Sequence, residues 1–211
     1  MVPYYNKPTQ TGIYQHFRAV VEAADGPVIV YDVPSRTITR MAVETILALS
    51  ELDGVVGLKD ATGDIGRANE LLRQLPPSFS IYSGDDATAA ALILMGAKGN
   101  ISVTANILPR LMHELCMAAL AGDIDTVRAL SRRMASINQA LFIESNPIPV
   151  KWAMHKMGLI PEGLRLPLVA LSPQYHGIVE RAMREAGIEL DEAMRSSKPL
   201  PEITASQFPW P

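Results

Sequence analysis

Short apolar segments alternate with amphipathic segments in the first half of the chain, and this alternation restricts the possible folds more than any other feature of the sequence. Apolar runs cover 28–33, 55–59, 79–83 and 99–103, and segments with helical periodicity separate them. The runs recur roughly every 20 to 28 residues, a spacing typical of βα units around a parallel sheet. Two architectures use such units: an open doubly wound sheet, and a closed barrel of eight strands.

Glycine spacing argues against nucleotide binding by either architecture. Gly57, Gly63 and Gly66 do not form the G-x-G-x-x-G turn of dinucleotide-binding folds, and Gly96 and Gly99 precede a predicted strand instead of following one. The pattern also changes after residue 106. Helices are predicted at 109–121, 124–142, 147–157 and 173–186 with no strand between them.

Lys59 ends the apolar run that begins at Val55, which is an unusual place for an amine. Burial among apolar side chains disfavours an ammonium ion, so the lysine pKa falls and a nucleophilic free amine becomes available. The alternative is a lysine that extends from the strand end into water. The first reading predicts Schiff-base chemistry.

Polar side chains gather at the carboxyl ends of the predicted strands, where parallel βα folds build their sites. The ends carry Tyr4-Tyr5, Tyr31, Lys59, Ser83-Gly84-Asp85 and Ile101-Ser102. A Schiff-base site needs an amine, a proton-transfer group and a cation for an acid substrate. Lys59, the tyrosines Tyr5 and Tyr31, and Arg36 can supply them. Considered alone, Tyr31 could also be an aromatic residue of the core, and Arg36 could be a solvated surface charge. Tyr4 and Tyr5 are adjacent, so their side chains must point in opposite directions if the chain is extended there.

Composition excludes several other classes of protein. A net charge of −3 with 48% hydrophobic residues suits an ordinary globular protein and gives no sign of a nucleic-acid partner. The single cysteine, Cys116, cannot form an internal disulfide and fits a core position in a reducing compartment. No run approaches the ~18 apolar residues of a membrane span, and no signal-like segment is present, so we expect no membrane partner and a cytoplasmic location. Asp85 and Asp86 fit helix N-caps better than metal ligands, and no metal site is predicted.

Six motifs in register resemble the dihydrodipicolinate synthase family. They are Pro3-Tyr4-Tyr5-Asn6-Lys7-Pro8, Tyr31-Asp32-Val33-Pro34-Ser35-Arg36-Thr37, Gly57-Leu58-Lys59-Asp60-Ala61-Thr62-Gly63, Ser83-Gly84-Asp85-Asp86, Ile101-Ser102-Val103-Thr104-Ala105-Asn106 and Asn146-Pro147-Ile148-Pro149-Val150-Lys151. The resemblance runs from residue 3 to about 187.

This resemblance implies an α/β fold of the (β/α)8 TIM barrel family. The expected organisation is a partial barrel at 1–106, about strands 5 to 8, then the last barrel helix and a helical subdomain at 107–187, and a mobile tail at 188–211. Homologues are usually tetramers built as a dimer of dimers, so a homo-oligomer is implied. No cofactor is implied.

The resemblance also implies roles for the residues at the strand ends. Lys59 would form a Schiff base with pyruvate, while Tyr31 would hold the bound pyruvate and relay protons. Tyr5 would extend that relay across a subunit interface. Arg36 would bind the carboxylate of L-aspartate 4-semialdehyde, and the Ile101 main chain would line the pyruvate site. Condensation and cyclisation would then serve lysine and diaminopimelate synthesis. The Pro-Ser-Arg-Thr loop that holds Arg36 resembles the related N-acetylneuraminate lyases less well.

Two features depart from the family pattern. Asp32 stands where members commonly have Asn, and the Gly-Thr-Thr-Gly-Glu motif of an early family loop is absent from the sequence. The second threonine of that motif joins the two tyrosines in the family's proton relay, and Tyr4 alone matches the lysine feedback site. We therefore expect an N-terminally truncated barrel that does not turn over substrate by itself. The alternative from another class is a noncatalytic half-barrel module that pairs with itself or with a separate N-terminal half, because a half barrel leaves strand edges unpaired.

Overall fold

The computed structural model describes residues 1–190, which divide into two compact units. The first is Met1–Gln139, and the second begins at Ala140, later than the boundary expected at residue 106. Each unit is described by itself. The predicted tail begins at 188, where Ile188 and Leu190 are both buried, and the rest of it lies outside the described residues.

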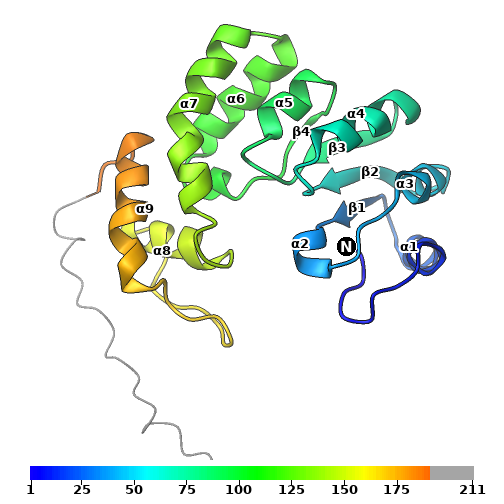
Figure 1. Ribbon diagram of the computed structural model, residues 1–211, viewed down its shortest axis with the longest axis horizontal. Helices are drawn as coiled ribbons and strands as arrows, with labels where there is room; N and C mark the ends of the chain where they lie inside the picture. The colour runs from blue at the N-terminus through cyan, green and yellow to red at the C-terminus, as the bar shows by residue number, and fades with distance from the viewer. Residues whose placement is uncertain (191–211) are drawn as a thin grey trace, which may run out of the picture. The chain divides into compact units, whose positions relative to one another are not determined.

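The first unit contains a parallel sheet whose strands follow one another in chain order (Figure 1). Its strands are β1 (Val28–Asp32), β2 (Val55–Asp60), β3 (Ser80–Ser83) and β4 (Gly99–Asn100). A doubly wound sheet reverses its strand order at a switch point. The order β1-β2-β3-β4 contains no reversal, so the sheet winds in one direction, as barrels do.

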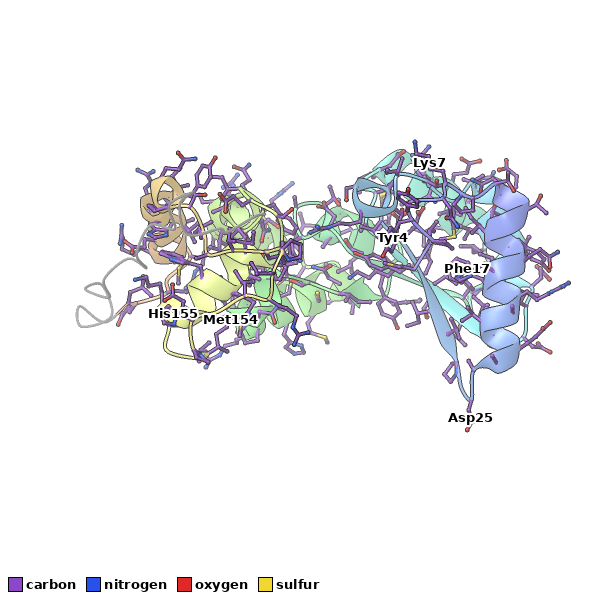
Figure 2. All side chains as sticks on the ribbon, turned by 90° about the horizontal axis from the view of Figure 1, so that it is seen from below. Tyr4, Lys7, Phe17, Asp25, Met154 and His155 are labelled. Carbon is purple, nitrogen blue, oxygen red and sulfur yellow. The ribbon has the colours of Figure 1, made fainter. Side chains whose placement is uncertain are left out.

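Helices cover the sheet in the same order as the strands. Along the layer α1 contacts α3, α3 contacts α4, α4 contacts α5, and α5 contacts α6. Their bounds are α1 (Gln10–Ala23), α3 (Val43–Ser50), α4 (Ile65–Gln74), α5 (Ala89–Leu94) and α6 (Pro109–Ala121). Figure 2 shows Phe17 on the side of α1 that faces the sheet, where it is buried, and Asp25 at the tip of the turn that leads into β1.

Helix caps explain several of these boundaries. The Asp64 carboxylate accepts a hydrogen bond from the Arg67 N–H at 2.9 Å and so caps the start of α4. The N-cap of α1 is Thr9, whose hydroxyl accepts from the Gly12 N–H, and not Thr11, which lies two residues later. Asp85 accepts from the N–H and hydroxyl of Thr88, which stabilises the turn before α5.

Two short segments differ from the expected secondary structure. The predicted loop after β1 forms a helical turn, α2 (Pro34–Thr37), which proline starts favourably at its first position. The strand expected at 99–103 ends at Asn100, and the last backbone donor that still reaches β3 is the Ile101 N–H, which bonds to the Ser83 carbonyl. The N–H groups of Val103 and Thr104 instead donate to the Asp86 carboxylate at 3.0 and 2.8 Å, just before the 3₁₀ turn η1 (Thr104–Asn106).

The remaining helices are α7 (Ile124–Ala140), α8 (Ile148–Lys156) and α9 (Pro173–Glu185). Within the second unit, Trp152 of α8 stacks on His176 of α9 with ring centroids 4.7 Å apart. The Ser172 hydroxyl, just before α9, donates to the Glu144 carboxylate. Among residues 1–190, no helix is both long and apolar enough to cross a membrane.

Candidate active site

Parallel pairing brings the carboxyl ends of β1 and β2 together residue by residue. Tyr31 pairs with Lys59 and Asp32 pairs with Asp60. Successive side chains on a strand point to opposite faces of the sheet. Tyr31 and Lys59 therefore share one face, where they are partly exposed, and the two aspartates lie buried on the other face.

Lys59 and Tyr31 are in direct contact across the two strands. The Lys59 Nζ lies 4.2 Å from the centroid of the Tyr31 ring, within the range of a cation–π interaction. Burial lowers the pKa of Lys59, and the negative charge of Asp86 partly opposes that shift. Burial raises the pKa of Tyr31, and the Arg36 charge opposes it. The pair thus combines an amine that loses its proton more easily than usual with a phenol that keeps its own.

Gly84 leaves the space that the Lys59 side chain occupies. A Cβ at this position would lie 2.8 Å from the Cε of Lys59 and 2.8 Å from the Cβ of Ala61. The Gly84 N–H also donates to the Asp60 carbonyl at 2.7 Å, which continues the ladder beyond β3. Only glycine permits the backbone to approach the lysine stem this closely.

Arg36 lies in the helical turn α2, close enough to Tyr31 to influence its pKa. Thr37 anchors this turn, because its buried hydroxyl contacts the Val33 carbonyl at 3.1 Å and the Thr39 carbonyl at 2.9 Å. Ile38 ends the turn with a φ of 65°, an uncommon value for a β-branched residue. The turn gives Arg36 a fixed backbone next to the pair of Lys59 and Tyr31.

Ile101 follows β4, and its N–H donates to the Ser83 carbonyl at 2.8 Å. The buried carboxylate of Asp86 holds the adjoining segment, since it also accepts from the Asn100 side-chain amide at 2.7 Å. Asp86 was expected to cap a helix, but it joins the loop after β3 to the loop after β4. This contact fixes the main chain on both sides of Ile101.

The structure does not bring Tyr5 to the lysine. Tyr5 is 88% exposed, has a φ of 58°, and makes no hydrogen bond to Tyr31 within residues 1–190. The segment nevertheless begins beside β1, because the Val2 N–H donates to the Tyr31 carbonyl at 3.0 Å. Tyr4 and Lys7 belong to the same loop before α1 (Figure 2).

Sequence reasoning missed a buried ionic cluster behind the pair of Lys59 and Tyr31. The Arg67 guanidinium on α4 bonds to Asp32 at 2.7 Å and to Asp60 at 2.9 Å. Asp32 has a raised pKa because burial and the nearby Asp60 charge outweigh Arg67 and the Met41 N–H, which act in the opposite direction. A signal was present in the sequence: two carboxylates directly follow two buried strands and require a cation nearby.

No metal site accompanies these residues in the part of the chain that the structure describes. Residues 1–190 contain no group of three or more His, Cys, Asp or Glu side chains with the geometry to hold a metal ion. The carboxylates of Asp85 and Asp86 instead accept hydrogen bonds from backbone and side-chain donors of the protein.

Comparison with known proteins gives one consistent result. Residues 1–186 match the model of the Dihydrodipicolinate synthetase family. The 4-hydroxy-tetrahydrodipicolinate synthase of Nitrosospira multiformis is 60% identical over 190 residues, which are 90% of this chain and 63% of that protein. The protein of the same name from Nitrosomonas eutropha is 56% identical over 188 residues, which are 89% of this chain and 64% of that protein.

A solved structure confirms the expected barrel fold. The chloride-inhibited dihydrodipicolinate synthase from Acinetobacter baumannii, crystallised with pyruvate, superposes with a TM-score of 0.87 at 50% identity. The match covers 89% of this chain and 64% of that one. The chain therefore has the fold of a TIM barrel over that share and spans slightly less than two thirds of the length of these relatives.

Proposed function

The chain belongs to the dihydrodipicolinate synthetase family, and we propose that it carries the Schiff-base part of a lyase that condenses pyruvate with L-aspartate 4-semialdehyde. The product is 4-hydroxy-tetrahydrodipicolinate, a precursor of diaminopimelate and lysine. The observation that carries the proposal is the contact between Lys59 and Tyr31, with Nζ 4.2 Å from the ring centroid and a lowered lysine pKa.

The chemistry begins at the amine of Lys59. Its lone pair attacks the carbonyl carbon of pyruvate, and the resulting carbinolamine loses water to give an iminium ion. The departing oxygen needs a proton, which Tyr31 can donate and later recover. Loss of a methyl proton gives an enamine, whose carbon attacks the aldehyde of the second substrate. The amino group of that substrate then displaces Lys59 and closes the ring, which restores the free lysine.

The other predicted residues bind and orient the substrates. Arg36 binds the carboxylate of the semialdehyde, for which a guanidinium next to Tyr31 is suited by its charge and planar donors. The main chain at Ile101 lines the pyruvate site, supported by the contacts of Asp86 with the adjoining loop.

A homo-oligomer would add Tyr5 to the relay that begins at Tyr31. A side chain that reaches into a neighbouring subunit must be exposed in a single chain, and Tyr5 is exposed with a backbone φ of 58°. Non-glycine residues in this conformation are often held so for function. The dimer of dimers expected for the complete barrel is tested by sedimentation of the wild type and a Tyr5→Ala variant.

Borohydride reduction in the presence of pyruvate tests the central step. The expected result is a single reduced adduct that peptide mapping places on Lys59, with none in the matched Lys59→Arg variant. Turnover is not expected from these 211 residues by themselves, because the tyrosine relay lacks its family threonine. Absence of the adduct, although chemical labelling finds Lys59 accessible, would reject the proposed function.

A noncatalytic module that pairs with a separate half barrel is the second candidate. Ile29 lies two residues before Tyr31 on the same strand and is 44% exposed. An exposed apolar side chain on this face of the sheet favours a second half barrel that packs over it. A monodisperse dimer with cooperative unfolding and no pyruvate adduct would support this candidate.

A further inference from the structure

Arg67 joins the ends of the two strands that carry the proposed chemistry. Its Nη1 bonds to Asp60 Oδ2 at 2.9 Å, and its Nη2 bonds to Asp32 Oδ2 at 2.7 Å. The same Nη2 donates to the Met41 carbonyl at 2.9 Å. The Arg67 side chain is 5% exposed and that of Asp32 is 0% exposed, so the bonds form away from water.

The second oxygen of each carboxylate is also occupied. Asp32 Oδ1 accepts from the Met41 N–H at 3.3 Å. Asp60 Oδ1 accepts from the N–H and the hydroxyl of Thr62 at 2.8 and 2.6 Å. Each carboxylate therefore presents Oδ2 to the guanidinium with little freedom to turn. Because a guanidinium is planar and rigid, it fixes the distance between the two carboxylates that it bridges. A lysine ammonium at the same place would not do so.

The positions of these carboxylates determine what the cluster controls. Asp32 follows Tyr31 and Asp60 follows Lys59, and the four residues form two adjacent pairs in the register of β1 and β2. Because alternate residues of a strand point to opposite faces, an anchor on the helix-facing side restrains the residue before it on the other side.

We propose that Arg67 is a positioning residue, which holds Lys59 and Tyr31 in the relative placement required for Schiff-base formation. Its effect on catalysis rests on the proposed function, but its effect on the placement of Lys59 does not. Asp32 serves the same arrangement, because its two carboxylate oxygens accept separately from Arg67 and from the Met41 N–H.

The alternative is an ion cluster that only stabilises the fold. Removing one member of a buried ionic cluster destabilises a protein, whichever function it serves. The two interpretations differ in the reactivity of Lys59 while the protein is still folded. Small displacements of a reacting group slow a reaction strongly, whereas a loss of stability alone leaves the folded site unchanged.

The test measures competitive acetylation of Lys59, relative to the exposed Lys98, on the whole chain at a temperature where every variant is folded by circular dichroism. The variants are Arg67→Met, Arg67→Lys and Asp32→Asn. Leu71→Ala is the matched control for lost stability, because Leu71 is fully buried on the same helix and has no polar side-chain atom that could join the ionic cluster. Arg73→Met is the control for lost charge, because Arg73 is exposed on that helix.

We expect Arg67→Met to change the relative labelling of Lys59 by about tenfold, and Arg67→Lys to change it by roughly threefold or more. Asp32→Asn leaves one side-chain oxygen for two donors that Asp32 serves with two oxygens, so it should change the labelling in the same direction as Arg67→Met. The two controls should stay within about twofold of the wild type. Labelling within that range in Arg67→Met, or an equal change in Leu71→Ala, would overturn the proposal. If Arg67→Met does not fold, Arg67→Lys decides the matter, and labelling like that of the wild type overturns it.

Pyruvate trapping on the same variants separates this inference from the proposed function. A parallel loss of trapping in the Arg67 variants supports both. A wild-type chain whose Lys59 is acetylated but traps no pyruvate would reject the proposed function, and the acetylation ratios alone would still decide the role of Arg67.

Discussion

Substitution of Gly84 by alanine should displace Lys59 without removing any functional group. Carbon atoms in contact normally lie about 3.5 to 4.0 Å apart. A methyl group at position 84 would lie 2.8 Å from the Cβ of Ala61 and 2.8 Å from the Cε of Lys59. It would thus be roughly 1 Å too close to both atoms.

Lys59 must yield more than Ala61 does. The Ala61 backbone is held by the hydrogen bond from its N–H to the Asp32 carbonyl at 2.9 Å, whereas the lysine stem is flexible. Overpacking of this kind costs about 1 to 3 kcal/mol of stability. A displacement of about 1 Å at a reacting group can reduce its rate by about a hundredfold. We therefore expect Gly84→Ala to reduce pyruvate trapping and Lys59 acetylation far more than it reduces stability.

Thermal unfolding and acetylation of Lys59, measured on the same samples, provide the assay. Gly66→Ala is the matched control, because a Cβ there would meet its nearest atom at 3.5 Å, an ordinary contact. It should leave the acetylation of Lys59 close to the wild-type value, and it should not lower the unfolding temperature, because alanine is the better helix former within α4. If Gly84→Ala labels Lys59 at the wild-type rate and unfolds at the wild-type temperature, the described packing of Gly84 against the lysine is refuted.

Three further predictions concern charge and helix stability. Asp86→Asn should lower the pKa of Lys59 further, because the negative charge of Asp86 stabilises the ammonium form of Lys59. The curve of Lys59 acetylation rate against pH should therefore shift to lower pH, and an unshifted curve would contradict this. Lys59→Met should raise the free energy of unfolding at neutral pH, and this gain should disappear as the pH rises toward 10.5. Between the lowered pKa of Lys59 and 10.5, the folded wild type binds fewer protons than the unfolded chain, so its stability increases with pH. Urea unfolding measures both proteins, and an equal difference in their unfolding free energies at neutral pH and near 10.5 would argue against the prediction. Gly177→Ala, within α9 and with no atom within 4 Å of the new Cβ, should stabilise the helix by about 0.5 to 1 kcal/mol, and a lower unfolding temperature would count against it.

Much of the strand arrangement follows directly from the sequence. The apolar runs ending near Tyr31 and Lys59 predict parallel strands, and parallel strands bring their carboxyl ends together. The contact between these two side chains was therefore predictable in kind, although its distance was not. Register was harder, because an irregularity between Val28 and Ile29 shifts the pairing of β1 with β2. Local sequence carries no clear sign of such a shift.

The two carboxylates indicate that a cation lies nearby, but that this cation is Arg67 was not predictable, for a different reason. Arg67 lies in the first turn of an amphipathic helix, where an arginine is usually solvated, and its partners are 35 and 7 residues away. Asp86 shows the same limit, since it bonds to backbone groups 17 and 18 residues later. Helical periodicity describes which face of a helix is apolar, but it does not show where a polar side chain ends once the layers pack.

The order of the strands has a consequence for how this unit forms during synthesis. Each strand pairs with the strand made just before it, so Val30 meets Leu58 and Leu58 meets Ile81 over short stretches of chain. Closing a connection of this length costs only slightly more entropy than closing a shorter one. A growing chain can therefore add one βα unit at a time, and the bridge from Arg67 to Asp32 can close as soon as α4 has emerged. On this route the lysine is set in place before the strands that follow it exist.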